Sequence, residues 1–154
     1  MYYEGKGVPR NYAEAAAWIK KGAIQGYSRS QFDLGVLYHR GHGVMQNYAE
    51  AVRWYREAAD QGDPDAQLNL GVMYYESKGV PQDYIQSHMW FNLAAARYSA
   101  TVAGATSETR NTAVNNRDQV AAKMTPAQIA EAQKLAREWK PREPIVFFTG
   151  TNNF

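Results

Sequence analysis

A period of 36 residues constrains this chain more than any other feature of its sequence. The stretch GVPRNYAEAAAW begins at Gly7, and close copies begin at Gly43 (GVMQNYAEAVRW) and at Gly79 (GVPQDYIQSHMW). Each copy has a tyrosine near its centre and ends in a tryptophan. A fixed period of roughly 20–50 residues is typical of solenoids, in which one supersecondary unit stacks on the next. We therefore predict a repeat protein rather than a chain with a duplicated catalytic motif.

Each repeat has the sequence pattern of two helices. In the second copy, apolar residues recur over 48–59 at the spacing of one helix face. Asn47 and Glu50 form a predicted capping box at the start of this helix. Further on, Asp63 supplies an N-cap and Pro64 suits the first position of the next helix. The repeat is therefore a helix, a tight turn, a second helix and a glycine-bearing loop.

The pattern predicts an all-α protein with two helices per repeat, which we name the A and B helices. The predicted A helices are 28–40 and 64–77, and the predicted B helices are 12–25, 48–61 and from 84 to about 103.

Three positions in the A helices carry specific expectations. Gly35 and Gly71 lie in helix interiors, where glycine costs about 1 kcal/mol relative to alanine. We expect a neighbouring helix to cross closely at each of them. Ser77 stands where the preceding repeat has Gly41. If that position needs a positive φ, Ser77 carries a small strain.

The repeat pattern resembles a known family. The motif AQxxLGxxY from Ala66 to Tyr74, followed by Gly79-Val80, a capping residue, an alanine and a tryptophan, is similar to the Sel-one-like repeat (SLR). The resemblance covers roughly residues 1–98. It implies membership of the tetratricopeptide-like superfamily, a right-handed α/α solenoid with its A helices on the concave side, and a bacterial adaptor or scaffold role.

The resemblance also bears on how the chain starts and on enzyme activity. Met1 is in register with Leu37 and Met73, so we expect the first repeat to lack most of its A helix. For the same reason the sequence leaves open whether a signal peptide precedes it, and the compartment is open between cytoplasm and periplasm. A cysteine-rich branch of the family carries a β-lactamase label, which does not transfer because this chain has no cysteine.

The period fails after Tyr98, and we divide the chain there. We predict repeats over 1–98, C-terminal capping helices over 99–140 and an extended tail over 141–154. The expected capping helices run from about Thr109 to Lys123 and from Thr125 to Trp139. Solenoid ends need a cap with a polar outer surface.

The tail contains an apolar run, Ile145–Phe148, after two helix-stopping residues, Pro141 and Pro144. One interpretation is a strap folded back on the capping helices. The other is that the run occupies a groove of this chain or of a neighbouring chain, as a peptide ligand does.

Sequence chemistry gives no support for an enzyme or a cofactor. The chain has no HExxH, no phosphate-binding Walker loop and no serine followed at the third position by lysine. His39 and His42 form the closest histidine pair, but no carboxylate accompanies them. We expect no metal and no cofactor. The tryptophans of the three copies are expected to pack between repeats.

Composition narrows the class of partner. A net charge of +2 with a pI near 8.8 is too mild, and the basic residues too scattered, to indicate nucleic-acid binding. No apolar run is long enough to insert across a bilayer. We therefore expect a protein or a peptide as the partner.

The candidate contacts are A-helix residues that lie off the Leu-Gly-Tyr packing stripe. They are Arg29, Phe32, Asp33, Val36, His39, Arg40, Asp65, Asn69, Val72, Tyr75 and Glu76. Their mixture of aromatic, aliphatic and charged groups suits a peptide segment better than a phosphate polymer. Asn69 suits pairing with a peptide backbone, and Arg29 or Arg40 suits a carboxylate.

Two other functions stay open at this point. The first is a structural unit that assembles end to end, as a homo-oligomer, through the tail or the shortened first repeat. The second, more distant, is a β-lactamase-like hydrolase.

Overall fold

Seven helices account for the regular structure in the part of the chain that the computed structural model describes, residues 11–100 and 107–143. They are α1 (Tyr12–Ile24), α2 (Ser28–Arg40), α3 (Tyr48–Asp60), α4 (Pro64–Glu76), α5 (Tyr84–Ala100), α6 (Ser107–Ala121) and α7 (Pro126–Glu138). No strand occurs within those two ranges. The all-α prediction is confirmed.

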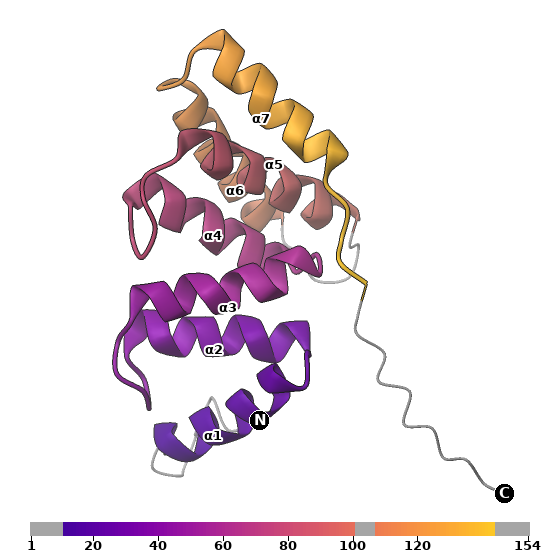
Figure 1. The fold of residues 1–154 in the computed structure, drawn as a ribbon. Coiled ribbons are helices and arrows are strands. Elements are labelled where there is room, and N and C mark those ends of the chain that lie inside the picture. Colours follow the sequence, from indigo (N-terminus) through magenta and orange to yellow (C-terminus); the bar gives the residue numbers. More distant parts are fainter. Residues whose placement is uncertain (1–10, 101–106, 144–154) are drawn as a thin grey trace, which may run out of the picture.

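The helices stack in chain order, from α1 at one end to α7 at the other (Figure 1). The A helices α2 and α4 pair with the B helices α3 and α5, and α1 supplies the B helix of the first repeat. Contacts of α1 with α2 and of α3 with α4 join one repeat to the next. This consecutive packing of helix pairs is the predicted α/α solenoid.

Helix boundaries match the predictions within about two residues. In the B helices, asparagines at the N-cap accept a hydrogen bond from the backbone of the glutamate three residues on, at 3.1 Å for both Asn11–Glu14 and Asn47–Glu50. α6 starts at Ser107, two residues before its expected start, Thr109. The expected end of the third B helix near residue 103 lies outside the described residues.

The tryptophan prediction holds for two repeats and is wrong for the first. Trp54 packs in a cluster with residues of α1 and α2, and Trp90 packs in a cluster formed by α3, α4 and α5. Their exposed fractions are 8% and 3%. Trp18 is 60% exposed because no described helix precedes α1 to cover it. The tryptophan of a repeat is therefore buried only where a preceding repeat covers it.

Close helix crossings explain the glycines inside the A helices. A Cβ added to Gly35 would lie 2.6 Å from the ring of Tyr55, and one added to Gly71 would lie 2.7 Å from the ring of Phe91. Tyr55 and Phe91 are 1% and 2% exposed, so neither ring has room to withdraw. The expected reason for the glycines is confirmed, and the intra-repeat crossing depends on them.

Buried glutamines provide a second repeated contact. Gln31 donates a side-chain hydrogen bond to the carbonyl of Ala23 at 3.3 Å, and Gln67 donates to Ala59 at 3.2 Å. Each carbonyl belongs to the last turn of the preceding B helix, where it also accepts the backbone N–H of Gly26 or of Gly62. The glutamine of each A helix therefore fastens its repeat to the one before.

The cap differs from a repeat in how its helices pack. α6 and α7 both pack on α5 and scarcely contact each other, whereas the two helices of a repeat pack closely together. α7 brings Leu135, Ala136 and Trp139 onto the cluster around Trp90, with 6.3 Å between the two indole centroids. The predicted capping role of α6 and α7 is thereby confirmed as a pair that flanks the last B helix.

One buried histidine lies in the α5–α6 contact. His88 is 3% exposed, and its Nδ1 has no hydrogen-bond partner among the described residues. Burial lowers the pKa of His88 below the ordinary 6.5, and the nearby cation of Arg117 on α6 lowers it further, while Asp118 raises it in part. His88 is therefore a neutral packing residue.

A difference in turn chemistry between repeats predicts opposite effects of two substitutions. Ser77 ends α4 with φ 56°, and Gly41 ends α2 with φ 70°. Left-handed backbone costs a non-glycine residue roughly 1–2 kcal/mol, while glycine loses roughly 0.5–1 kcal/mol of extra entropy. Ser77→Gly should raise the free energy of unfolding by up to about 1 kcal/mol, and Gly41→Ser should lower it. Urea denaturation measures both changes. A lower free energy of unfolding for Ser77→Gly would show that the left-handed backbone at Ser77 is not strained.

The neutral His88 makes stability depend on pH below neutrality. The unfolded chain takes up a proton near the ordinary pKa, whereas the folded chain resists protonation until lower pH. The stability is thus fully present above about pH 6.5 and decreases as the pH falls. The half-buried ring of His39, whose pKa burial also lowers, acts in the same direction.

We expect the free energy of unfolding to be lower at about pH 5 than at about pH 7.5. His88→Gln should shrink that difference, and adding His39→Gln should shrink it again. Urea titrations at the two pH values measure the difference, which is independent of the cost of each substitution at neutral pH. An unchanged difference in the double variant would show that these rings are not its source.

Candidate peptide-binding face

The face predicted to bind a partner is formed by A-helix residues, and it divides into three parts in the structure. At the start of α2, Arg29 lies beside three aspartates. Its guanidinium is 2.8 Å from the carboxylate of Asp65 on α4, 3.6 Å from Asp33 and 3.8 Å from Asp63. The structure therefore brings three of the predicted contact residues, Arg29, Asp33 and Asp65, into one ionic cluster.

The cluster is anchored to the interior by a tyrosine. Tyr98 of α5, 7% exposed, donates its hydroxyl to the other carboxylate oxygen of Asp65 at 2.5 Å. Burial, together with this hydrogen bond, raises the pKa of Tyr98. Burial also raises the pKa of Asp63, which its N-cap hydrogen bond from Ala66 partly offsets. The Arg29 charge is thus already shared with Asp65, although its side chain stays 59% exposed.

The middle of α2 turns its predicted contacts towards α3. Phe32 lies beneath the Arg29 guanidinium at 4.3 Å and packs against Tyr55 with 5.8 Å between ring centroids. The Nδ1 of His39 is 3.2 Å from the Tyr55 hydroxyl. Val36 is half-buried beside them. These side chains serve the packing of repeat two and present only their edges to solvent.

The histidine pair does not form a metal site. His39 contacts Tyr55, whereas the ring of His42 stacks on Tyr12 of α1 at 4.9 Å between centroids. Across residues 11–100 and 107–143, no group of three or more metal-ligating side chains gathers.

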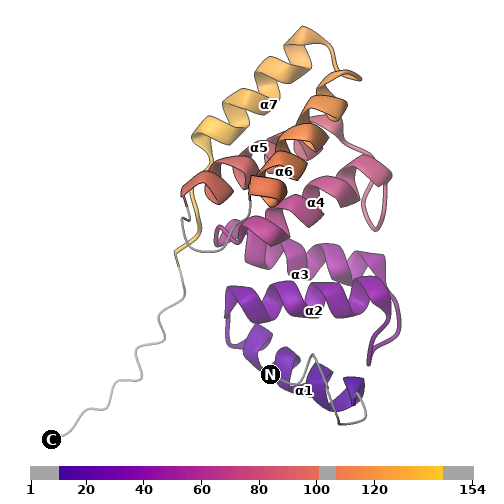
Figure 2. The same cartoon turned by 180° about the vertical axis from the view of Figure 1, so that it is seen from behind.

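The third part lies between α4 and α6, where the structure forms a cavity. Val72, Tyr75 and Glu76 of α4 line it together with Phe91 of α5, and its volume is about 140 Å³. The remaining wall comes from α6, through Asn116, Gln119 and Val120. Figure 2 shows α6 beside α4 on this side of the molecule. Lys123 extends over the Tyr75 ring at 5.0 Å.

α6 is the part of this face that sequence reasoning missed. Its mixed polar composition has no repeat glycine, so it was assigned only to the cap. Only the tertiary structure shows that α6 belongs to this face, because α6 packs on the B helix α5 as the A helix α4 packs on α3. Asn116 and Gln119 thus join the predicted contacts.

Two predicted contacts have no competing partner in the structure. The half-buried side chain of Asn69 and the exposed side chain of Arg40 make no hydrogen bond or ion pair with another described residue. Asn69 lies one turn before Val72 and Met73 on α4. An amide free in this position suits the backbone of a bound peptide.

Comparisons with known proteins bear on the whole chain. The family model named Sel1 repeat matches residues 1–27, 28–63 and 64–99. Comparison with curated protein sequences gives no match. None of the described helices is both long enough and apolar enough to cross a membrane.

Solved structures agree with the family match. A protective antigen of uropathogenic Escherichia coli strains with an SLR fold gives a TM-score of 0.75 at 30% identity, over 87% of this chain. This chain spans only 27% of that protein. A Sel1 repeat protein from Oxalobacter formigenes gives a TM-score of 0.59 at 40% identity, covering 62% of this chain and 72% of the other.

Proposed function

The chain belongs to the Sel1 repeat family, and we propose that it is a non-catalytic adaptor whose A-helix face, on α2, α4 and α6, binds an extended protein segment. Sel1 repeat solenoids generally act as scaffolds for protein interactions. The finer statement concerns where this chain binds. The cavity between α4 and α6, with the unpaired amide of Asn69 nearby, is the observation that carries it.

The chemistry of this face supports a peptide rather than a small substrate. The cavity, at about 140 Å³, is smaller than the roughly 300–1,000 Å³ of typical small-molecule sites. It does suit a single side chain of a segment that runs across the helices. Val72, Tyr75 and Phe91 offer apolar contact, while Glu76 and Asn116 supply polar groups at the edge.

Asn69→Ala combined with Arg40→Ala tests the assignment. Neither side chain is paired with another described residue, so the free energy of unfolding should change by less than about 1 kcal/mol. Partner proteins retained by the full chain from an extract of the source cell should fall at least about tenfold, since each lost polar anchor weakens binding by roughly 1 kcal/mol or more. Quantitative mass spectrometry measures the retained proteins.

The matched control is Lys20→Ala combined with Lys134→Ala, which removes two exposed side chains outside the A helices, on α1 and α7. It should leave partner retention unchanged. Equal retention by the wild type and the Asn69/Arg40 variant would remove the support for this face.

A second function, end-to-end self-assembly, is favoured by Trp18. Its counterparts Trp54 and Trp90 are covered by the preceding repeat, whereas Trp18 is 60% exposed on α1. A second chain that covers it would bury apolar surface worth roughly 25 cal/mol per Å².

Light scattering after size-exclusion chromatography tests self-assembly. Assembly through α1 predicts a mass that rises with concentration in the wild type and stays monomeric in Trp18→Ser. The Trp18 side chain is not part of the core, so Trp18→Ser should have little effect on the free energy of unfolding. A wild type that is monomeric at all concentrations would contradict assembly and leave the adaptor function unaffected.

A further inference from the structure

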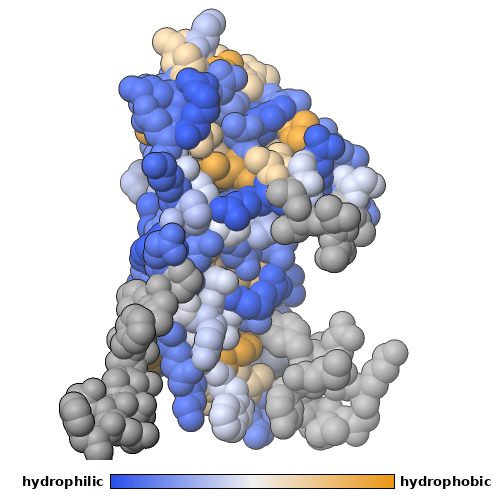
Figure 3. Space-filling model, turned by 90° about the vertical axis from the view of Figure 1, so that its right-hand side faces the viewer, coloured by the Kyte–Doolittle hydropathy of each residue, from blue (hydrophilic) through white to orange (hydrophobic). Residues whose placement is uncertain are grey.

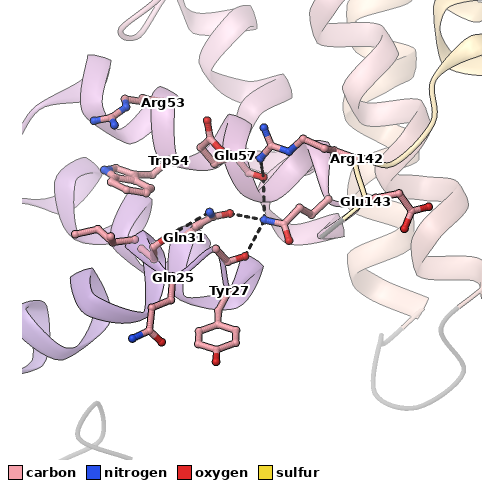
Figure 4. A pocket seen from close by; sticks show the side chains of 12 residues that line it. Gln25, Tyr27, Gln31, Arg53, Trp54, Glu57, Arg142 and Glu143 are labelled. Carbon is pink, nitrogen blue, oxygen red and sulfur yellow. Dashed lines mark hydrogen bonds and ion pairs between the residues drawn. The ribbon is translucent and has the colours of Figure 1, made fainter. Parts of the chain in front are cut away.

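A second cavity, larger than the one between α4 and α6, lies away from the A-helix face at the C-terminal ends of the B helices. It has a volume of about 430 Å³ and is bounded by the α1–α2 turn, by α3 and by the chain that follows α7. The lining includes Ile24, Tyr27, Trp54, Glu57, Arg142 and Glu143. Figure 4 shows Trp54 and Glu57 on one wall, Tyr27 on another and Arg142 reaching in from the side.

The chain after α7 forms a strap, Lys140–Glu143, that runs down the ends of the B helices. The Arg142 amide donates a hydrogen bond to the Asp60 carbonyl at 2.6 Å, and the Arg142 guanidinium lies 2.7 Å from the Glu57 carboxylate. Both partners belong to the last turn of α3. The strap therefore passes beyond the capping helices to repeat two. The interpretation of Ile145–Phe148 as a strap on the capping helices falls on residues outside the described part of the chain.

Between Trp139 and Arg142, three residues apart, the chain passes from one B helix to the next. Trp139 lies at α5, where the Arg97 guanidinium is 5.5 Å from the centre of its indole, and Arg142 lies at α3. Three residues of extended chain span about 10 Å, which matches the roughly 8–10 Å between packed helices. Three further residues of extended chain after Arg142 would be long enough to reach the end of the next B helix, α1.

The end of α1 differs from the other B-helix ends where that next step arrives. Ile24 and Tyr27 are 67% and 63% exposed. The second repeat has Asp60 and Asp63 at the equivalent positions, and the third has the small residues Ala96 and Ser99. Figure 3 shows this side of the molecule as mostly hydrophilic, with orange, hydrophobic spots in both its upper and its lower half. Large exposed apolar side chains therefore occur at this helix end, whereas its counterparts carry aspartates or small residues.

We propose that this cavity is a docking site for an extended apolar peptide and that its occupant is the chain's own segment Ile145–Phe148, which lies outside the described residues. Alternate side chains of an extended segment point to opposite sides. Ile145 and Phe147 therefore share one side, which faces Ile24, Tyr27 and the edge of Trp54. The docked tail ties the cap to the first repeat and leaves the A-helix face free for a partner.

The absence of cysteine in the chain permits a direct test by disulfide trapping. In the full chain, Ile24→Cys combined with Ile145→Cys should oxidise to an intramolecular disulfide in a monomer. The control pair combines Ile145→Cys with Met45→Cys, which is 89% exposed in the loop at the other end of α2. α2 has 13 residues and is about 20 Å long, so the control pair should oxidise at least several-fold more slowly.

Two results of the trapping experiment would overturn the proposal. A disulfide that joins two chains would assign the cavity to the tail of a second copy. Equal oxidation rates of the test and control pairs would show that the tail does not dock at α1.

Hydrogen exchange provides a second measurement that does not depend on the cysteines. In the full chain with Ile145→Asp and Phe147→Asp, amides in the last turn of α1 and in the α1–α2 turn should exchange several-fold faster than in the wild type. Ile24→Asp should have the same effect, because it places a charge on the opposite side of the same contact. Unchanged exchange in the tail variant would refute docking.

Discussion

The close crossing of the A and B helices at Gly35 and Gly71 is the constraint on which the rest of the structure depends. An aromatic ring of the B helix occupies the space that a Cβ would fill, and the ring is itself buried. The glycine is unfavourable for the isolated helix by about 1 kcal/mol, so its benefit lies in the packing. Because the crossing recurs after 36 residues, each repeat presents the same surface to the next, and a linear stack results.

This stack has two sides with different chemistry. On the A-helix side, residues outside the packing stripe are not repeated, and they form an ionic cluster, a packed aromatic segment and a small cavity. At the B-helix ends, the strap pairs with the last turn of α3 and borders a larger cavity. The two sites share no described lining residue, so partner binding at one does not require the other to be vacated.

Sequence reasoning succeeded where a residue acts within its own repeat. The asparagine caps and the close crossings at the mid-helix glycines were predicted, because they depend on neighbours close in sequence or on the repeated crossing. The positive φ of Ser77 was expected only on the condition that its position shares the backbone of Gly41, which it does. It failed for Trp18, whose burial requires a preceding repeat. It also could not show that His39 would turn towards Tyr55, or that Arg29 would already be paired with Asp65. That the predicted contact residues touch a partner stays a prediction.

The sequence by itself determined the helical repeat, its period and the family, because spacing, caps and glycines are local properties that recur at a fixed interval. Only the tertiary structure decided that α6 joins α4 around a cavity and that the strap descends to α3. Both depend on contacts between segments far apart in the chain, as in the pair Glu57 and Arg142, and no periodicity encodes such contacts. Cavities arise in the same way, since they are the space left between elements whose relative positions only packing fixes.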